Sequence, residues 1–322
     1  MDKTPAVPET LVDAIRYFSD PDKCLAFMVE LRWPDGVTCP TCEGRDVSFI
    51  STRRVWTCRE QHKRRQFSAK VGTIFEDSPI GLDKWFAAMW MIASAKNGVS
   101  SYEAARALGV TQKSAWFMMH RIRLAMQGGT FEKLSGEVEV DETFIGGKAR
   151  FMHKAKRAAK ITGTGGKNKN AVMGLLERHG PHGHSRVKLK HVPNVRRMTL
   201  APEVRQHVVP GATVYSDALK SYTGLSDAFT HQVIDHAESY VEGHVHTNGM
   251  ENFWSLLKRC IKGTYVSVEP FHLFRYLDEQ ALRFNTRKAK DGERFAEILR
   301  SVVGKRLTYN GLTGKGMLPA TT

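Results

Sequence analysis

The chain has 322 residues, of which 48 are Lys or Arg and 33 are Asp or Glu, so its formal charge is 48 − 33 = +15. This length allows two or three domains, and this charge favours a polyanionic partner, most commonly nucleic acid, over a basic surface that only aids solubility. No apolar run reaches the ~18 residues of a membrane span, and the amino-terminal residues lack the apolar core of a signal peptide, so we expect a cytoplasmic protein.

Two helices are expected at the start of the chain, around residues 9–18 and 21–31, before the turn sequence WPDG at 33–36 interrupts the pattern. From there to about residue 70, short strands and turns carry four potential metal ligands in the spacing C-x2-C-x15-C-x3-H: Cys39, Cys42, Cys58 and His62. Two close pairs of sulfur and nitrogen ligands are typical of a zinc ribbon. We therefore predict one structural Zn2+, because four protein ligands leave no open position for a substrate.

His62 is the less usual of these ligands, since a cysteine is commoner at its position. The alternative to a zinc site is a set of incidental thiols. The five cysteines are an odd number, which favours a reducing compartment over a disulfide framework. Basic residues surround the ligand pairs, with only Glu60 as counter-charge and with aromatic Trp56 and Phe67 between them: Arg53, Arg54, Arg59, Lys63, Arg64, Arg65 and Lys70. This composition is typical of a module that contacts nucleic-acid phosphates.

A helix is predicted over residues 82–96, and residues 100–126 follow as a short helix, a turn at Gly109 and a longer helix. Ser100 with Glu103 predicts a capping box for the first, and Thr111 caps the second. These proportions are typical of a helix-turn-helix, although a purely packing role is the alternative. The residues expected to be available to a DNA groove are Gln112, Lys113, Ser114 and Arg121.

From residue 136 the pattern changes to strands at 137–145, 171–178 and 185–192, then to a helix at 201–208, a strand at 213–216, a helix from 218 and a strand at 231–235. Helices near 248–262, 270–286 and 293–303 follow. This alternation predicts an α/β domain with a mixed sheet. Residues 148–169 contain eight Lys or Arg and no acidic residue, which predicts a mobile basic loop or a plain solvated one.

Three acidic residues lie where separate elements would converge. Asp141 is in a strand, Asp217 ends the next apolar strand, and Glu251 begins a helix. Carboxylates from separate elements are what two-metal phosphoryl transfer requires. Capping is the alternative for two of them: Asp217 is placed to cap the helix that follows, and Asn248 with Glu251 fits a capping box.

The order Asp141, Asp217, Glu251, with Lys258 seven residues beyond Glu251 (258 − 251 = 7), resembles the DDE transposases with a ribonuclease H-like core. The chain is more similar still to the zinc-ribbon insertion-sequence transposases of bacteria, the ISXO2-like transposases. The resemblance covers residues 25–290 and depends on the motifs CPTC, CREQH, QFSAKVGTIFEDSPI, VEVDETFIGG, YSDALKSY, HTNGMENFWSLLKR and FHLFRYLDEQALRFNTR.

The resemblance implies that Asp141, Asp217 and a third residue hold two Mg2+ or Mn2+ ions, and that Lys258 contacts DNA near the scissile phosphate. The third ligand is expected to be Glu251, with Asn248 as the alternative, because relatives can carry an asparagine there. The implied partners are double-stranded DNA, as terminal inverted repeats and as target, and a second copy of the chain, since two element ends must be joined. No membrane partner is expected, and a DNA-bound copy would be associated with the bacterial nucleoid.

These expectations define five segments: an N-terminal helical segment (1–35), a zinc ribbon (36–75), a helix-turn-helix region (80–130), a ribonuclease H-like catalytic domain (136–290) and a C-terminal helix and tail (291–322). The predicted function is cleavage and strand transfer at the ends of an insertion sequence. Two alternatives are a DNA-binding factor whose catalytic core has lost its activity and a structure-specific nuclease of the same fold. The two N-terminal modules favour sequence reading over the shape recognition of a junction nuclease.

Overall fold

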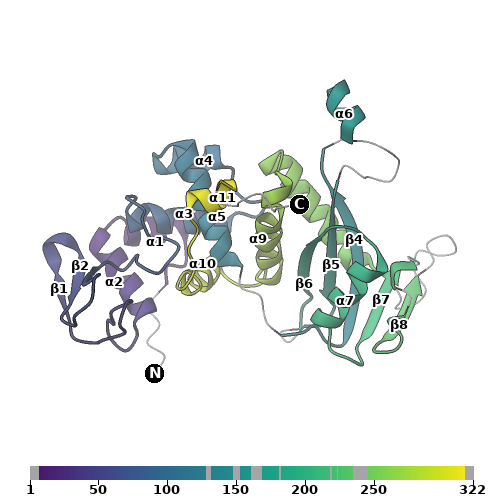
Figure 1. The fold of residues 1–322 in the computed structure, drawn as a ribbon, viewed down its shortest axis with the longest axis horizontal. Helices are drawn as coiled ribbons and strands as arrows, with labels where there is room; N and C mark the ends of the chain where they lie inside the picture. Colours follow the sequence, from purple (N-terminus) through teal and green to yellow (C-terminus); the bar gives the residue numbers. More distant parts are fainter. Residues whose placement is uncertain are drawn as a thin grey trace. The chain divides into compact units, whose positions relative to one another are not determined.

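The computed structural model describes residues 7–127, 132–147, 153–160, 169–180, 183–217, 220–222, 224–234 and 246–315 (Figure 1). The chain forms two compact units, one of residues 1–128 with 288–322 and one of residues 129–287. We refer to them as unit 1 and unit 2. No helix in the described ranges is long and apolar enough to cross a membrane.

The core of unit 1 is an aromatic cluster that joins both ends of the chain. Its helices are α1 (Leu11–Phe18), α2 (Pro21–Arg32), α3 (Leu82–Ser94) and α10 (Asp291–Arg300). Phe295 of α10 is fully buried, and its ring centroid lies 5.2 Å from that of Phe18, 5.9 Å from Phe86 and 5.6 Å from Trp90. Helix α10, which we predicted as part of a separate C-terminal segment, therefore completes the N-terminal core.

A three-stranded antiparallel sheet holds the predicted zinc ligands. Strands β1 (Val47–Ile50), β2 (Val55–Cys58) and β3 (Gln66–Phe67) pair in that order. Trp56 of β2 is buried. Its ring stacks on that of Phe67, with the two centroids 6.0 Å apart, and contacts that of Trp33 edge-on, with the centroids 5.7 Å apart. The strands are too short to be stable as an isolated sheet, so the stability of this part of unit 1 depends on side-chain packing and on the cluster of potential metal ligands.

Helices α4 (Ser101–Leu108) and α5 (Gln112–Met126) have the predicted boundaries and caps. Ser100 Oγ accepts from the backbone N–H of Glu103, Thr111 Oγ1 accepts from that of Ser114, and Gly109 between the helices is left-handed at φ 60°. One expectation is wrong: Arg121 is buried and unavailable to DNA. It donates to the backbone oxygens of Ile74, Glu76 and Leu307, because the C-terminal segment, which includes α11 (Tyr309–Thr313), packs against α5.

Unit 2 is built on a five-stranded mixed sheet with the order β6-β5-β4-β7-β8. The strands are β4 (Glu137–Ile145), β5 (Asn170–Glu177), β6 (Arg186–Val192), β7 (Thr213–Asp217) and β8 (Thr230–Ile234). The first three in chain order pair antiparallel, while β7 pairs parallel with β4 and β8 parallel with β7. The predicted mixed α/β sheet is therefore confirmed.

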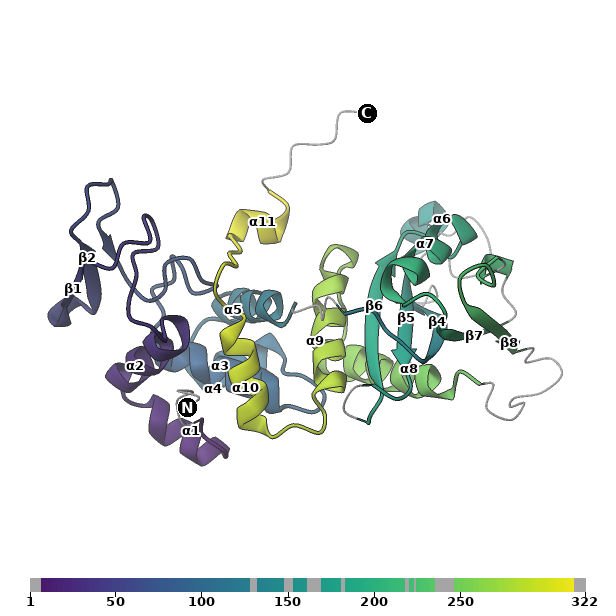
Figure 2. The same ribbon diagram turned by 90° about the horizontal axis from the view of Figure 1, so that it is seen from below.

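Helices cover both faces of this sheet (Figure 2). Helix α7 (Arg197–His207) packs on one face against Val138 and Val140 of β4. Helices α8 (Asn248–Cys260) and α9 (Leu273–Asn285) pack on the other face, against apolar residues of β5 and β6. The alternation of β4 consequently turns Glu139 and Asp141 toward α8.

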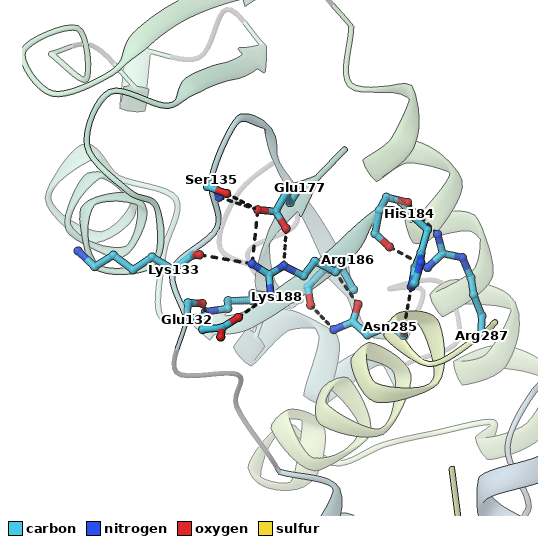
Figure 3. Close-up of polar contacts among 11 residues, drawn as sticks. Glu132, Lys133, Ser135, Glu177, His184, Arg186, Lys188, Asn285 and Arg287 are labelled. Atoms are coloured by element: carbon cyan, nitrogen blue, oxygen red, sulfur yellow. Dashed lines mark hydrogen bonds and ion pairs between the residues drawn. The ribbon is translucent and has the colours of Figure 1, made fainter. Parts of the chain in front are cut away.

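The chain enters and leaves unit 2 along the same edge strand (Figure 3). At the entry, Lys188 Nζ donates to the backbone oxygen of Glu132 at 2.5 Å, and buried Glu177 accepts from Ser135 N at 2.7 Å and pairs with Arg186. At the exit, the Asn285 side chain bonds both Val187 N (2.7 Å) and Val187 O (3.0 Å), and Arg287 donates to Ser185 O. Strand β6 thus holds both the segment by which the chain enters unit 2 and the segment by which it leaves.

Two expectations differ from the structure or lie beyond it. Part of the predicted basic loop is a helix, α6 (Lys154–Lys160), while residues 148–152 and 161–168 lie outside the described residues. The helix expected from residue 218 is described only at Lys220–Tyr222, as a 3-10 turn. Helix α8 continues at Ile261–Tyr265 as a π-helix, a conformation that sequence patterns do not signal.

Candidate active site

Three carboxylates lie on one face of the unit 2 sheet, near the point where β7 ends. Asp141 lies in β4 and Asp217 is the last residue of β7. Because these strands are parallel and Val140 pairs with Ser216, Asp141 and Asp217 occupy the next rung on neighbouring strands. Glu251 is exposed in the first turn of α8, which packs on the same face. The fold thus brings together the three residues that the sequence singled out.

The neighbouring charges affect the ionisation of Asp141. Burial raises the pKa of its carboxyl, and the charges of Asp217 and Glu251 raise that pKa further. Two hydrogen bonds oppose this shift: Trp254 Nε1–H donates to Oδ2 at 2.8 Å, and the backbone N–H of Glu142 donates to Oδ1 at 2.8 Å. Neither Asp141 nor Glu251 forms an ion pair with Lys or Arg among the described residues.

Glu142 is a fourth carboxylate at this place, and we did not predict it. Burial raises its pKa to about 8, with further contributions from the charges of Asp141 and Asp217. Its Oε1 is buried and has no hydrogen-bond partner in the described part of the chain. The available signal was two adjacent acidic residues, Asp141 and Glu142, in the strand EVEVDETFI. Alternation places their side chains on opposite faces of the sheet, so Glu142 lies near the other carboxylates across β4 and not on their face.

Thr247, the N-cap residue before helix α8, forms no side-chain hydrogen bond to the helix. The alternative capping box of Asn248 with Glu251 is not formed either. Glu139 supplies the cap from the sheet. Its carboxylate is buried and accepts from the backbone N–H of Met250 at 2.8 Å and from Arg178 Nε at 2.9 Å. A carboxylate at a helix N-terminus satisfies a free N–H and complements the helix dipole. Glu139 therefore fixes the turn that carries Glu251.

Arg178 and Gly249 complete this anchor. The Arg178 guanidinium lies over the Tyr215 ring at 4.1 Å and donates to the backbone oxygen of His246 at 2.6 Å, just before the helix. A Cβ on Gly249 would lie 2.8 Å from Glu139 Oε2. Only glycine at this position lets the helix approach the carboxylate so closely. Sequence patterns missed Glu139 because they assign it simply to a strand.

We expect Glu139→Gln to weaken divalent-metal binding about 10–100-fold, the usual loss when a residue that orients a metal ligand is changed. The amide keeps one acceptor but leaves Arg178 with only its longer ion pair to Glu137, at 3.6 Å. Glu177→Gln is the matched control, since Glu177 is equally buried and pairs with Arg186 away from α8. Both variants should lose about 1–3 kcal/mol of stability, whereas calorimetric titration with Mn2+ should separate them. Equal metal affinities in the two variants would rule out a positioning role for Glu139.

Gly174 gives Trp254 its place beside Asp141. It pairs with Asp141 across β4 and β5, and a Cβ there would lie 2.7 Å from two atoms of the Trp254 indole. Gly174→Ala is therefore expected to cost about 1–3 kcal/mol by overpacking and to displace the indole from the carboxylate. Thermal unfolding and tryptophan fluorescence measure both effects. Gly263→Ala, where an added Cβ meets open space, should leave both unchanged, and a stable Gly174→Ala protein would contradict the assigned packing.

The other predicted residues of this site lie on α8. Asn248 is its first residue and is exposed, and Lys258 is exposed in its last turns. Since seven residues at ~1.5 Å each separate Glu251 from Lys258, the ammonium follows the carboxylate by about 10 Å along the helix axis. The charged face predicted for this helix is therefore present beside its buried apolar face of Met250, Phe253, Trp254 and Leu257.

Unit 1 brings together the second predicted ligand set. The ligand atoms of Cys39, Cys42, Cys58 and His62 all lie within 4.8 Å of one another. Cys39 Sγ is 3.4 Å from His62 Nε2, and Cys42 Sγ is 3.6 Å from Cys58 Sγ. Around a tetrahedral zinc with bonds of ~2.0–2.3 Å, ligand atoms stand roughly 3.5–3.8 Å apart. The donor set and its spacing fit Zn2+, with His62 as the fourth ligand.

The basic surface around this cluster is smaller than predicted. Arg54 pairs with Asp22 at 2.6 Å and Arg59 with Asp46 at 3.6 Å, so Glu60 is not the only counter-charge. Arg65 donates to the backbone oxygen of Cys58, and Lys70 donates to those of Ser78 and Ile80. Lys63 and Arg64 remain exposed and have no partner among the described residues.

The protein thus has two units, one with a set of sulfur and nitrogen ligands that fits Zn2+ and one with acidic residues on the face of a mixed sheet. Comparison with known families matches residues 19–64 to a transposase zinc-ribbon domain and residues 133–285 to an ISXO2-like transposase domain. The chain therefore belongs to the ISXO2-like transposase family, and the resemblance drawn from its motifs is confirmed.

Two relatives agree with this assignment. An uncharacterized protein in transposable element ISH50 of Halobacterium salinarum is 28% identical over 259 residues, which cover 77% of this chain and 85% of that protein. An uncharacterized transposase-like protein of Haemophilus influenzae is 37% identical over 100 residues, which cover 31% of this chain and 80% of that protein.

Proposed function

We propose that this chain is a DNA transposase that binds the terminal inverted repeats of an insertion sequence and cleaves and joins DNA with divalent metal ions. The observation that carries the proposal is the convergence of Asp141, Asp217 and Glu251 on one face of the sheet. The strand order, with three antiparallel strands followed by two parallel ones, supports a ribonuclease H-like core. Family membership supports DNA as the partner.

Asp141, Asp217 and Glu251 are the proposed ligands of two Mg2+ or Mn2+ ions. When bound, such ions stabilise the attacking and the leaving oxygen of a phosphoryl transfer. The Trp254 N–H and the backbone of Glu142 hold the Asp141 carboxylate in one orientation. Glu139 holds the first turn of α8, and with it Glu251, against the sheet. Lys258 is proposed to contact a phosphate near the scissile one.

The proposed chemistry has two steps at one site. Water attacks a phosphorus atom of the donor strand, forming a P–O bond while the bond to the 3′ oxygen breaks, which leaves a 3′-OH and a 5′-phosphate. That 3′-OH then attacks a phosphorus atom of the target, whose own 3′ oxygen departs with a proton. No covalent protein intermediate is required, so no side chain has to serve as a nucleophile.

Recognition of the repeats is assigned to unit 1. A structural Zn2+ would tie the ribbon together, with Lys63 and Arg64 free to meet phosphates, and α5 would present Lys113 to a groove. Joining two ends requires both at once, so we propose at least a dimer on DNA, acting in the cytoplasm at the nucleoid.

The test uses the full zinc-loaded protein with a labelled duplex that carries the repeat from the flanks of its own gene, plus Mg2+ or Mn2+. Glu251→Ala should abolish strand cleavage, while Asn248→Ala, at an exposed position in the same helical turn, should retain it. The reverse result would transfer the third-ligand role to Asn248. Repeat binding without cleavage in either metal would refute the enzyme and favour a DNA-binding factor whose catalytic core has lost its activity.

A further inference from the structure

A basic cavity lies beside the carboxylate cluster in unit 2. Its volume is about 460 Å³, and its walls come from the end of β4, the start of β5 and the end of α8 with the π-helix that follows. This volume falls within the roughly 300–1,000 Å³ of typical ligand sites. The proposed mechanism uses one of its lining residues, Lys258, and leaves the rest of the cavity unexplained.

Three lysines line the cavity: Lys169, Lys258 and Lys262. No acidic residue is among its described lining residues, and within the described chain none of the three lysines has a hydrogen-bond or ion-pair partner. Lysines on a plain surface are commonly paired or dispersed, whereas three unpaired ammonium groups around one hollow repel each other unless an anion lies between them.

The lining backbone leaves room for such an anion. Gly146 and Gly147 form one wall at the end of β4. A Cβ on Gly146 would lie 3.2 Å from Lys169 Cγ, so glycine lets Lys169 lie across this wall, and a Cβ on Gly147 would meet open space. Paired glycines allow a phosphate to approach the backbone closely. Charged side chains and accessible backbone together are what DNA strands contact most often.

Another part of the lining is strained. Val266 has φ 61° and ψ −56°, follows the π-helix directly, and is 78% exposed. A left-handed conformation is costly for a β-branched residue, and such strain, like π-helical turns, occurs preferentially at binding sites. The strained turn places Val266 on the rim of the cavity instead of in the apolar core.

We propose that this cavity is a DNA-backbone subsite, in which Lys169 and Lys262 bind a phosphate of the strand held by the carboxylates. The inference deepens the proposed transposase function and rests on it. Lys258 lies about 10 Å from Glu251 along α8. The bound phosphate is therefore within a few linkages of the scissile one.

The test measures the salt dependence of affinity for the terminal-repeat duplex, with the full-length zinc-loaded protein. Lys169→Gln and Lys262→Gln are each expected to reduce the slope of log affinity against log salt by about 1, the signature of one lost phosphate contact. Arg259→Gln is the matched control, because it removes one exposed charge from the same helix outside the cavity. A slope unchanged in both lysine variants would overturn the proposal.

Position is tested with duplexes that carry a single neutral methylphosphonate linkage. Neutral linkages two to four positions from the cleavage site should weaken binding of the native protein and have no further effect on a Lys169→Gln/Lys262→Gln variant. Equal effects on both proteins would place the phosphate elsewhere. Displacement of the duplex by a free deoxynucleoside monophosphate, from the native protein only, would reveal a mononucleotide site and refute a strand-backbone role. The salt dependence of affinity is measured without cleavage. A protein that binds the duplex with the expected slopes but does not cleave it would therefore refute the enzyme function and leave the phosphate subsite intact.

Discussion

Replacement of Asp141 by asparagine is expected to reduce metal-dependent DNA cleavage by at least about 10²–10³-fold, the loss typical when one preorganised electrostatic group is removed. The amide oxygen can still accept one of the two hydrogen bonds that Asp141 receives, from the Trp254 N–H or from the backbone N–H of Glu142. One hydrogen bond and one negative charge are therefore lost, while the residue keeps its size and shape. Because burial and the neighbouring carboxylates raise the pKa of Asp141, its charged form is unfavourable in the metal-free fold. The variant should therefore be no less stable than the native protein without metal.

This opposition between activity and stability makes the experiment decisive. Cleavage rate, Mn2+ affinity and thermal unfolding are measured on the same preparation. Asp227→Asn serves as the control, since Asp227 is an exposed residue of unit 2 that pairs with Arg205, and it should retain cleavage. If Asp141→Asn cleaved DNA at the native rate, the carboxylate cluster would not be the active site.

Replacement of Cys58 by serine is expected to release the zinc ion and to unfold the three-stranded sheet. Cys58 ends β2 and lies between the other ligands, and strands of four, four and two residues cannot hold this sheet without metal. Zinc content should fall from about one ion per chain to about zero. Affinity for the terminal repeat should fall toward non-specific binding, by up to about 10³-fold.

Cys24→Ser provides the comparison. Cys24 is a buried thiol of α2 outside the cluster that donates to the backbone oxygen of Phe18, and serine preserves that donor. This variant should keep both zinc and repeat affinity. Zinc is quantified by release with a thiol reagent. If the Cys58→Ser protein bound the repeat with native affinity, the zinc ribbon would not take part in DNA recognition.

Several features of the molecule were predictable because they depend on neighbours in the sequence. The caps Ser100 and Thr111, the turn at Gly109 and the ligand spacing from Cys39 to His62 all follow from local chemistry. The acidic residues could be singled out because Asp141 is a charged residue inside a strand, Asp217 ends a strand and Glu251 lies in the first turn of a helix, in an order that resembles a known family.

Other features depend on contacts that no local pattern signals. Arg121 looked available to DNA, but backbone oxygens of residues 74, 76 and 307 surround it, and the last of these is 186 residues away in sequence. Glu139 and Glu142 were missed because alternation predicts one buried and one solvated face, whereas helices cover both faces of this sheet. Acidic residues on either face of β4 are therefore buried or partly buried, and only tertiary structure shows what each one contacts.

The segments by which the chain enters and leaves unit 2 are both held at strand β6, and this has a consequence for the domain organisation of the chain. A domain whose first and last segments lie side by side on one strand can be inserted into a host fold without stretching it. Unit 2 has this form, and unit 1 is the host, since its core needs Phe18 and Phe295 from opposite sides of the insertion. The two units are thus nested in the sequence, not consecutive, and unit 2 could be exchanged or removed by joining the chain at two neighbouring points.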